Sequence, residues 1–169
     1  VPGFSAADIR VESSNGAIVS GQNGQYNVKV NGSSREVNIT VYAKGRKMGT
    51  TPFRVRNIPN PMPMIGGIPS TTAAVSKAQL CAQSSILATL GSDFAYDLPF
   101  RVTSFRFIYQ PRNRPPIVLN ASGSTLTSQM KNYICNSRSG DRFTFEQIKA
   151  KSTLYNISRS VPPISVVIR

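Results

Sequence analysis

The chain has 169 residues, which is enough for one domain of ordinary size or two small ones. It has 20 Lys and Arg residues against 7 Asp and Glu residues, a formal net charge of +13, and it has neither His nor Trp. The absence of His excludes Ser-His-Asp and Cys-His catalysis and His-containing metal sites, and 2 Cys residues are too few for a four-thiolate zinc site. No apolar run reaches the roughly 18–20 residues of a membrane span, and the opening residues lack the pattern of a signal peptide.

The basic residues are spread along the chain and are not gathered in a tail. Residues 1–58 contain eight basic and three acidic residues, and residues 59–169 contain twelve and four. A strongly basic surface favours acidic partners such as nucleic acid, anionic lipid or an acidic protein. Because no RNP1 pattern, zinc-finger spacing or basic heptad helix is present, we expect a soluble cationic surface and no nucleic-acid binding.

The first 58 residues are predicted to form short strands separated by turns. Alternating polar and apolar residues favour strands at 8–13, 25–30 and 35–43. Asn-Gly pairs begin at positions 15, 23 and 31, and Asn-Gly is a strong hairpin signal because it tolerates positive φ at both central positions. The pattern predicts an antiparallel meander or sandwich. A further turn at 45–49 and a last strand from Phe53 to Asn57 complete this half.

A proline-rich segment follows, in which Pro59, Pro61 and Pro63 occupy alternate positions. Proline cannot donate to a sheet ladder and favours extended polyproline geometry. We therefore predict a stiff connector at about 58–64, which divides the chain into domains at 1–58 and 59–169.

The second half is also predicted to consist mostly of strands. Apolar alternation favours strands at 101–109, 117–119, 143–148 and 164–168. In the first of these, Thr103, Phe105, Phe107 and Tyr109 are expected to share one face. Ser76 and Gln79 have capping-box spacing, which favours a helical turn at 77–82, although an extended segment at 74–82 fits as well.

A second short helix is predicted at 128–135, where Met130, Tyr133 and Ile134 recur at helical spacing. The fold class that follows is all-β. We expect two small β-sandwich (Ig-like) domains in tandem, the second with one or two short helices.

Cys81 and Cys135 are the two cysteines of the chain. A disulfide between them would close a loop of roughly 54 residues, for which loop entropy predicts about 4 kcal/mol of stabilisation in an oxidising compartment. Two buried, unpaired thiols that act as small apolar residues are the alternative. The sequence leaves both open.

The segment from Tyr109 to Pro116 is the strongest candidate for binding. Arg112 and Arg114 are flanked by prolines at the exit of a predicted strand, and guanidinium groups on a stiff loop suit carboxylates and phosphates. We predict partner contacts from Arg106, Arg112 and Arg114, with Tyr109 as an aromatic contact. A solvated hairpin loop without a ligand is the alternative.

Acidic residues are too few and too scattered to predict an enzyme. Asp93 and Asp97 are four positions apart and fit a turn before a strand better than a carboxylate pair in a sugar cleft. An enzyme would need acid chemistry from Asp93, Asp97, Asp141 or Glu146 in one cleft. The Gly-rich segments lack the Lys and the following helix of a phosphate loop. We expect no enzyme activity, no cofactor and no metal.

Several motifs resemble one protein family. They are TPFRVRNIPNP at 51–61, MIGG at 64–67, VPGFSAADIRVES at 1–13, FAYDLPF at 94–100 followed by VTSF at 102–105, and FTFEQI at 143–148. Together they resemble the GldM/PorM family of gliding motility and type IX secretion. The basic charge is most similar to the PorM branch.

The resemblance implies the distal part of a dimeric periplasmic shaft. Members of the family are held in the inner membrane by an N-terminal helix, which this chain lacks, and meet a PorL-type partner there. Their C-terminal end meets a PorK/PorN-type assembly on the outer-membrane side. We therefore expect a non-enzymatic periplasmic scaffold for protein transport. Two alternatives are a cell-surface adhesion or carbohydrate-binding β-sandwich and a polyanion-binding module.

Overall fold

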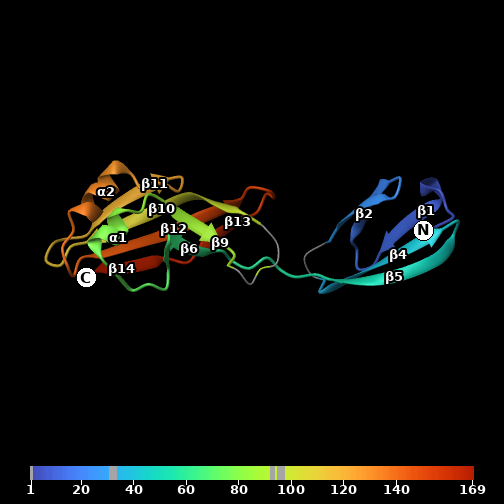
Figure 1. Ribbon diagram of the computed structural model, residues 1–169, viewed down its shortest axis with the longest axis horizontal. Helices are drawn as coiled ribbons and strands as arrows, with labels where there is room; N and C mark the ends of the chain where they lie inside the picture. Colours follow the sequence, from blue (N-terminus) through green and yellow to red (C-terminus); the bar gives the residue numbers. More distant parts are fainter. Residues whose placement is uncertain (1, 31–33, 92–93, 95–97) are drawn as a thin grey trace. The chain divides into compact units, whose positions relative to one another are not determined.

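The structure is a computed structural model that describes residues 2–30, 34–91, 94 and 98–169. It divides into two compact units, Val1–Ile58 and Pro59–Arg169. Strands dominate both units and the second contains two short α-helices (Figure 1), which confirms the predicted all-β tandem. The predicted Asn31-Gly32 turn, the Asp93 and Asp97 pair and residues 95–97 of the motif at 94–100 lie outside the described residues.

The first unit contains a three-stranded sheet of order β1-β4-β5 and a separate β2-β3 hairpin. The elements are the 3-10 turn η1 (Ala6–Asp8) and the strands β1 (Ile9–Ser13), β2 (Ile18–Gln22), β3 (Gln25–Lys29), β4 (Glu36–Ala43) and β5 (Arg46–Arg54). A meander is therefore the wrong topology, because β1 pairs with β4 and not with β2. The hydroxyl of Tyr26 connects the hairpin to the sheet by donating to the Ile9 carbonyl at 2.8 Å.

Left-handed residue pairs make three of the turns in this unit. Asn15-Gly16 has φ of 58° and 69°, and Asn23-Gly24 has φ of 56° and 81°, as Asn-Gly predicts. The third pair is Lys44-Gly45, with φ of 46° and 78°. The turn expected at 45–49 therefore lies earlier. The last strand starts at Arg46 and ends at Arg54, where the sequence predicted Phe53 to Asn57.

The second unit is organised around one large sheet of order β7-β6-β9-β10-β12-β14-β8, to which β11 adds along β10 and β13 along β12. Its strands are β6 (Met62–Ile65), β7 (Ile68–Pro69), β8 (Ala74–Val75), β9 (Ile86–Thr89), β10 (Phe100–Gln110), β11 (Ile117–Ser122), β12 (Arg142–Ser152), β13 (Ser158–Val161) and β14 (Ile164–Ile168). All pairings except β14 with β8 are antiparallel.

Strand β6 begins inside the expected connector. Met62 lies opposite Thr89 and Pro63 opposite Ala88, so residues 62–64 belong to the sheet of the second unit. Pro61 and Pro63 are buried. Burial of the two proline rings keeps this segment in the sheet of the second unit, although its composition alone favours a free extended connector.

Irregular registers in β10 and β12 change which residues face inwards. The β10–β12 register shifts between Val102 and Arg106, and Gln147 in β12 has φ of 50°. Such a bulge reverses the alternation of side chains. Phe100 and Val102 are therefore buried at one end of β10, whereas Thr103 is exposed and does not share the face of Phe105, contrary to the sequence prediction.

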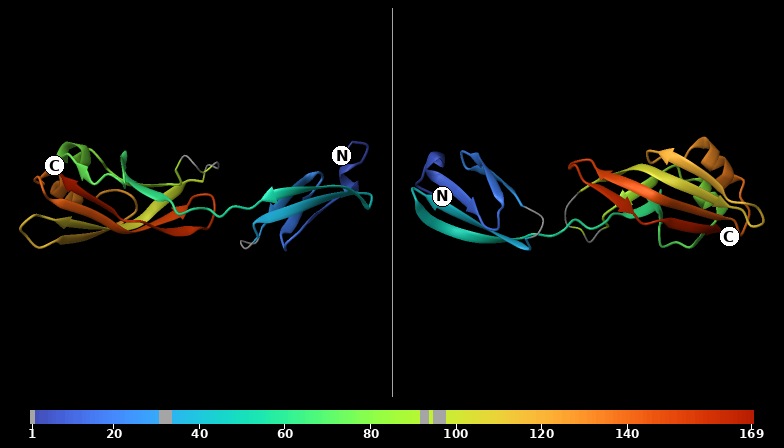
Figure 2. Two further views of the ribbon diagram at one scale, coloured as in Figure 1. Left: turned by 90° about the horizontal axis from the view of Figure 1, so that it is seen from below. Right: turned by 180° about the vertical axis from the view of Figure 1, so that it is seen from behind.

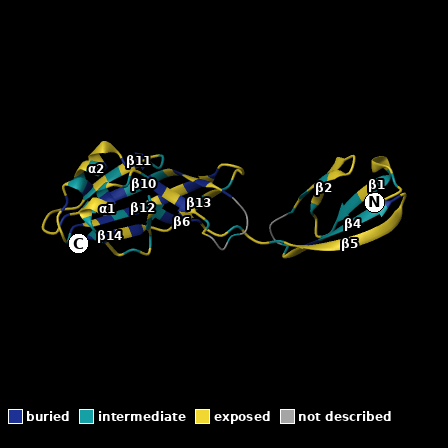
Figure 3. Cartoon of the chain, viewed as in Figure 1, coloured by how far each residue is buried: buried dark blue, intermediate teal, exposed yellow. Residues whose placement is uncertain are grey.

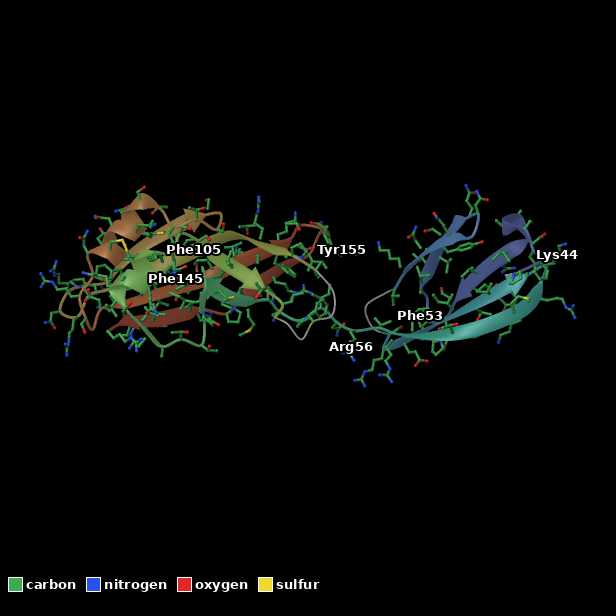
Figure 4. All side chains as sticks on the ribbon, viewed as in Figure 1. Lys44, Phe53, Arg56, Phe105, Phe145 and Tyr155 are labelled. Carbon is green, nitrogen blue, oxygen red and sulfur yellow. A yellow bond between two sulfur atoms is a disulfide. The ribbon has the colours of Figure 1, made fainter. Side chains whose placement is uncertain are left out.

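The core of the second unit lies between this sheet and the helices α1 (Lys77–Cys81) and α2 (Ser128–Cys135). Figure 3 shows buried residues concentrated on the inner strands of this unit, and Phe105 and Phe145 lie within it in Figure 4. Leu80 from α1 and Met130 and Ile134 from α2 are at most 1 % exposed. Burial of these apolar faces is the main stabilisation of the two short helices.

Sequence signals at the helix starts are confirmed in atomic detail. The Ser76 hydroxyl accepts from the Gln79 N–H at 3.2 Å, and the Gln79 side chain accepts from the Ser76 N–H at 3.1 Å. This capping box selects the helical alternative over the extended one. Helix α2 occupies the predicted residues, and Thr127 caps it by accepting from the Met130 N–H at 3.3 Å.

Candidate binding pocket at the arginine loop

An open pocket of about 770 Å³ lies at the α2 end of the second unit. Three segments form it: the loop between β10 and β11, the C-terminal half of α2, and the loop between α2 and β12. Figure 2 shows these loops at one end of the unit, close to the C-terminus. The lining residues are Tyr109, Pro111, Arg112, Asn113, Arg114, Pro115, Ile117, Asn132, Tyr133, Asn136, Arg138, Ser139 and Asp141.

Asp141 connects the two loops. Its side chain is 4 % exposed. Oδ1 accepts from the Arg112 N–H at 3.1 Å, and Oδ2 accepts from the Arg138 N–H at 2.9 Å and the Tyr109 hydroxyl at 2.8 Å. Burial alone would raise the pKa of Asp141. The hydrogen bonds from the Arg138 N–H, the Tyr109 hydroxyl and the Arg112 N–H outweigh burial and lower this pKa below its ordinary value.

Tyr109 forms the aromatic floor of the pocket. Its ring stacks on Phe143, with centroids 4.9 Å apart, and lies 5.4 Å from the ring of Tyr133. Burial, followed by the hydrogen bond to Asp141 and its negative charge, raises the pKa of Tyr109, although Arg114 and Arg138 act in the opposite direction. Tyr109 is therefore held in place by Asp141 and Phe143, and it forms part of the pocket lining.

Three arginines surround the pocket: Arg112, Arg114 and Arg138. All three are exposed. The Arg112 side chain passes over Gly140, because a Cβ built there would lie 3.2 Å from Arg112 Cδ. Gly140 has φ of 90° and allows this close approach. The loop backbone is further fixed by Gln110, whose amide donates to the Arg114 carbonyl at 3.1 Å.

These arginines have no ion-pair partner among the described residues. The ion pairs that the structure describes are Arg10–Glu12, Lys44–Asp8 and Arg106–Glu146. Asp141 is the acidic residue in the lining, and both of its oxygens already accept hydrogen bonds. Asp141 offsets one of the three guanidinium charges, so the lining keeps an excess of positive charge.

The predicted contact residues are only partly together. Tyr109, Arg112 and Arg114 line the pocket. Arg106 does not line the pocket. It lies opposite Glu146 of β12 in the sheet, and its Nε is 3.6 Å from Glu146 Oε1. Sequence reasoning missed Arg138 and the α2 residues Asn132 and Tyr133. An Asp three residues after a basic residue, as in Arg138 and Asp141, was the available signal, but it is a common turn pattern.

The structure joins Cys81 and Cys135 by a disulfide, one of the two alternatives that the sequence left open. The bond connects the last residue of α1 to the last residue of α2. Because Asn132 and Tyr133 line the pocket from α2, the disulfide restrains one wall of the pocket.

Of the four acidic residues considered for an enzyme, Asp141 and Glu146 lie among the described residues. Glu146 pairs with Arg106, and Asp141 accepts hydrogen bonds from Tyr109, Arg112 and Arg138. In the part of the chain that the structure describes, no three Cys, Asp or Glu side chains are grouped so that they could bind a metal ion. The helices described are also too short and too polar to cross a membrane.

Two tandem all-β units, the second with a basic surface pocket, define a modular β protein with a surface suited to binding. The family model for the GldM third domain matches residues 1–56, and the model for the GldM C-terminal domain matches residues 59–169. The chain belongs to the GldM family and is a component of the gliding-motility and type IX secretion machinery. None of the curated proteins matches it.

Proposed function

We propose that this chain is a non-enzymatic periplasmic scaffold, the distal part of the type IX secretion shaft. In this proposal its second unit binds the PorK/PorN-type assembly on the outer-membrane side. The observation that carries the proposal is the family match, since two consecutive domain types of GldM cover nearly the whole chain in order.

The construction of the second unit suits a scaffold. Strands β10 and β12 have 11 residues each and pair along most of their length, which corresponds to roughly 35 Å of antiparallel ladder, interrupted by the register shift between Val102 and Arg106. A load along these strands would have to break many ladder hydrogen bonds together. The long β10–β12 pairing and the basic pocket thus supply the two properties that a load-bearing adaptor needs.

Dimer formation is part of the proposal. Strands β1 and β5 are the edges of the three-stranded sheet, and all nine residues of β5 are exposed. Phe53 is 51 % exposed on this strand (Figure 4). Unpaired edges with exposed apolar side chains are where a second chain adds a strand. Sedimentation of the chain at micromolar concentration would give a dimer mass, and a monomer at all concentrations would contradict this part.

Co-purification tests the partner assignment. The full chain and its double variant Arg112→Glu/Arg114→Glu are each mixed with the PorN-type and PorK-type proteins. A matched control is Arg101→Glu/Lys151→Glu, because these two exposed residues face each other on β10 and β12 and change the net charge equally. We expect the pocket variant to lose the partner and the control to keep it.

The result also separates the scaffold from a polyanion-binding module, which the net charge of +13 would equally suit. Such a module would bind heparin with an affinity that falls steeply with salt. Both double variants would then weaken heparin binding alike. That outcome, together with no recovery of either partner protein, would overturn the proposal.

A further inference from the structure

We propose that the pocket binds an acidic peptide segment of a partner protein, whose carboxylates pair with Arg112, Arg114 and Arg138. The inference extends the proposed function by naming the chemistry that the partner presents. It rests on that function in one respect, which is that the ligand is a segment of another protein.

The pocket lining has more positive than negative charge. Three guanidinium groups lie around one cavity, and the lining includes a single carboxylate. That carboxylate, Asp141, is 4 % exposed and is occupied by two backbone N–H groups and a tyrosine hydroxyl. Like charges in proximity repel each other, and an anionic ligand would relieve this repulsion.

The arginine-bearing loops are held before any ligand arrives. Backbone N–H groups of Arg112 and Arg138 both donate to Asp141, at 3.1 and 2.9 Å, so one buried carboxylate sets the spacing of the two loops. Pro111 is buried, and the Arg112 side chain rests against Gly140. Preorganisation of this kind lowers the entropic cost of binding.

The residue types favour carboxylates on a peptide. A planar guanidinium forms paired hydrogen bonds to a carboxylate or a phosphate. The volume of about 770 Å³ far exceeds one anionic group, and Pro115, Ile117 and Tyr133 supply apolar surface beside the arginines. Asn132 and Asn136 add amide groups suited to a peptide backbone. A short segment with alternating acidic and apolar side chains fits this lining.

Single-stranded nucleic acid fits less well. Its binding relies on aromatic faces that are open for bases to stack on. Tyr109 is half-buried, its ring stacks on Phe143, and its hydroxyl is bound to Asp141. Tyr109, one of the two tyrosines in the lining, is therefore already engaged inside the protein.

The test uses the full chain and three labelled ligands in fluorescence anisotropy titrations. They are an eight-residue peptide of alternating Glu and Leu, the same peptide with Gln for Glu, and an eight-nucleotide oligothymidine. We expect the Glu peptide to bind, and the Gln peptide to bind at least about tenfold more weakly, since each hydrogen bond to a charged group contributes about that factor. Tighter, pocket-dependent binding of the oligonucleotide would overturn the peptide assignment.

Variants locate the binding. Arg112→Gln/Arg138→Gln is expected to raise the dissociation constant of the Glu peptide at least about tenfold. The control Arg101→Gln/Lys151→Gln removes the same charge far along the β10–β12 ladder and is expected to change it less than about twofold, because exposed charges at that distance are screened. Equal losses in both variants would show diffuse attraction and reject the pocket.

A charge-preserving variant tests the guanidinium geometry. Arg112→Lys/Arg138→Lys keeps the net charge and the fold, and its melting temperature verifies the fold. We expect several-fold weaker binding of the Glu peptide because an ammonium group cannot form the paired hydrogen bonds. Unchanged binding would reject the paired arrangement.

The inference and the proposed function fail separately. If the PorN-type or PorK-type protein co-purifies with Arg112→Gln/Arg138→Gln as well as with the unaltered chain, the pocket is rejected and the scaffold remains. If the Glu peptide binds in the pocket but neither protein co-purifies, the pocket remains and the partner assignment is rejected.

Discussion

The two units differ in how much core they bury. Among the described residues of the first unit, Val37 and Ala43 are the fully buried hydrophobic side chains, whereas the second unit buries aromatic and aliphatic residues from its main sheet and both helices (Figure 3). The first unit has fewer residues, and small units bury a smaller fraction of their surface. The comparison predicts that two units of similar strand content differ in stability, because burial stabilises and strand pairing alone contributes little.

Strand exposure makes the contrast concrete. Strand β5 in the first unit has nine residues, all exposed, although its sequence contains Met48 and Phe53. Strand β12 in the second unit has 11 residues and buries Phe143, Phe145 and Ile148. The second unit should therefore unfold at a higher temperature, and changes in one unit should leave the transition of the other in place.

The largest expected effect is Phe145→Ala in the second unit. Phe145 is 0 % exposed and its ring lies 5.4 Å from that of Phe107. We expect a loss of about 3–5 kcal/mol in the free energy of unfolding of this unit. The control Phe53→Ala, at a side chain that is 51 % exposed, should cost less than about 1 kcal/mol. Calorimetry resolves the two transitions, and equal effects would contradict the difference in burial.

Next in size is loss of the Cys81–Cys135 disulfide, with a sequence separation of 54 residues. Loop entropy gives roughly 4 kcal/mol as an upper value and 2–4 kcal/mol is typical. A reducing agent should lower the melting temperature of the second unit and leave that of the first unchanged, because both cysteines lie in the second. The double variant Cys81→Ser/Cys135→Ser should reproduce the shift and abolish the response to reductant. A shift in both transitions would show that the units are coupled.

Gly21→Ala should selectively damage the first unit. Gly21 has φ of 134°, and a Cβ there would lie 2.2 Å from the Gln25 carbonyl oxygen, inside the β2–β3 hairpin. We expect a loss of about 1–3 kcal/mol. The control is Gly49→Ala on β5, where a Cβ meets nothing within 4 Å. Hydrogen exchange of the Tyr26 and Val28 amides should accelerate only in the Gly21 variant, and protection equal to the unaltered chain would disprove the clash.

The smallest expected effect is the pH dependence that arises from Asp141. Its pKa is lowered in the folded chain, so its contribution to stability is complete above the unfolded pKa of about 4 and is lost as pH falls through the folded value. Asp141→Asn should cost about 1–3 kcal/mol at pH 7 because two N–H donors lose a charged acceptor.

The difference in unfolding free energy between the unaltered chain and Asp141→Asn should shrink below pH 4. The first unit, which lacks this carboxylate, serves as the internal reference in the same calorimetric scans. A difference that stays constant between pH 7 and pH 2 would exclude the ionised carboxylate as the source of the stability.

Local features of the fold were predictable from the sequence. The Asn15-Gly16 and Asn23-Gly24 turns, the Ser76–Gln79 capping box and helix α2 all depend on residues within a few positions of each other. The third turn was missed because Lys44 has no intrinsic preference for positive φ. The last strand of the first unit was predicted too late in the chain, because the turn that precedes it was also placed too late.

The candidate site was predictable only in part. Arg112 and Arg114 stand out because prolines flank them. Arg138 and Asp141 belong to a different loop, and the alternation of β10 suggested a regular strand in which Thr103 faces inwards. The register shift between Val102 and Arg106 reverses that alternation, and it occurs in the pairing with β12, a strand distant in the sequence.

The sequence by itself determined the all-β class, the two-part division and the short-range turns and caps. Each of these depends on neighbouring residues, whose conformational preferences add along the chain. Only the tertiary structure decided that β1 pairs with β4, that β6 joins the large sheet and that two loops meet at Asp141. Those outcomes depend on burial and hydrogen bonding between segments far apart in the chain, for which a single sequence contains no local signal.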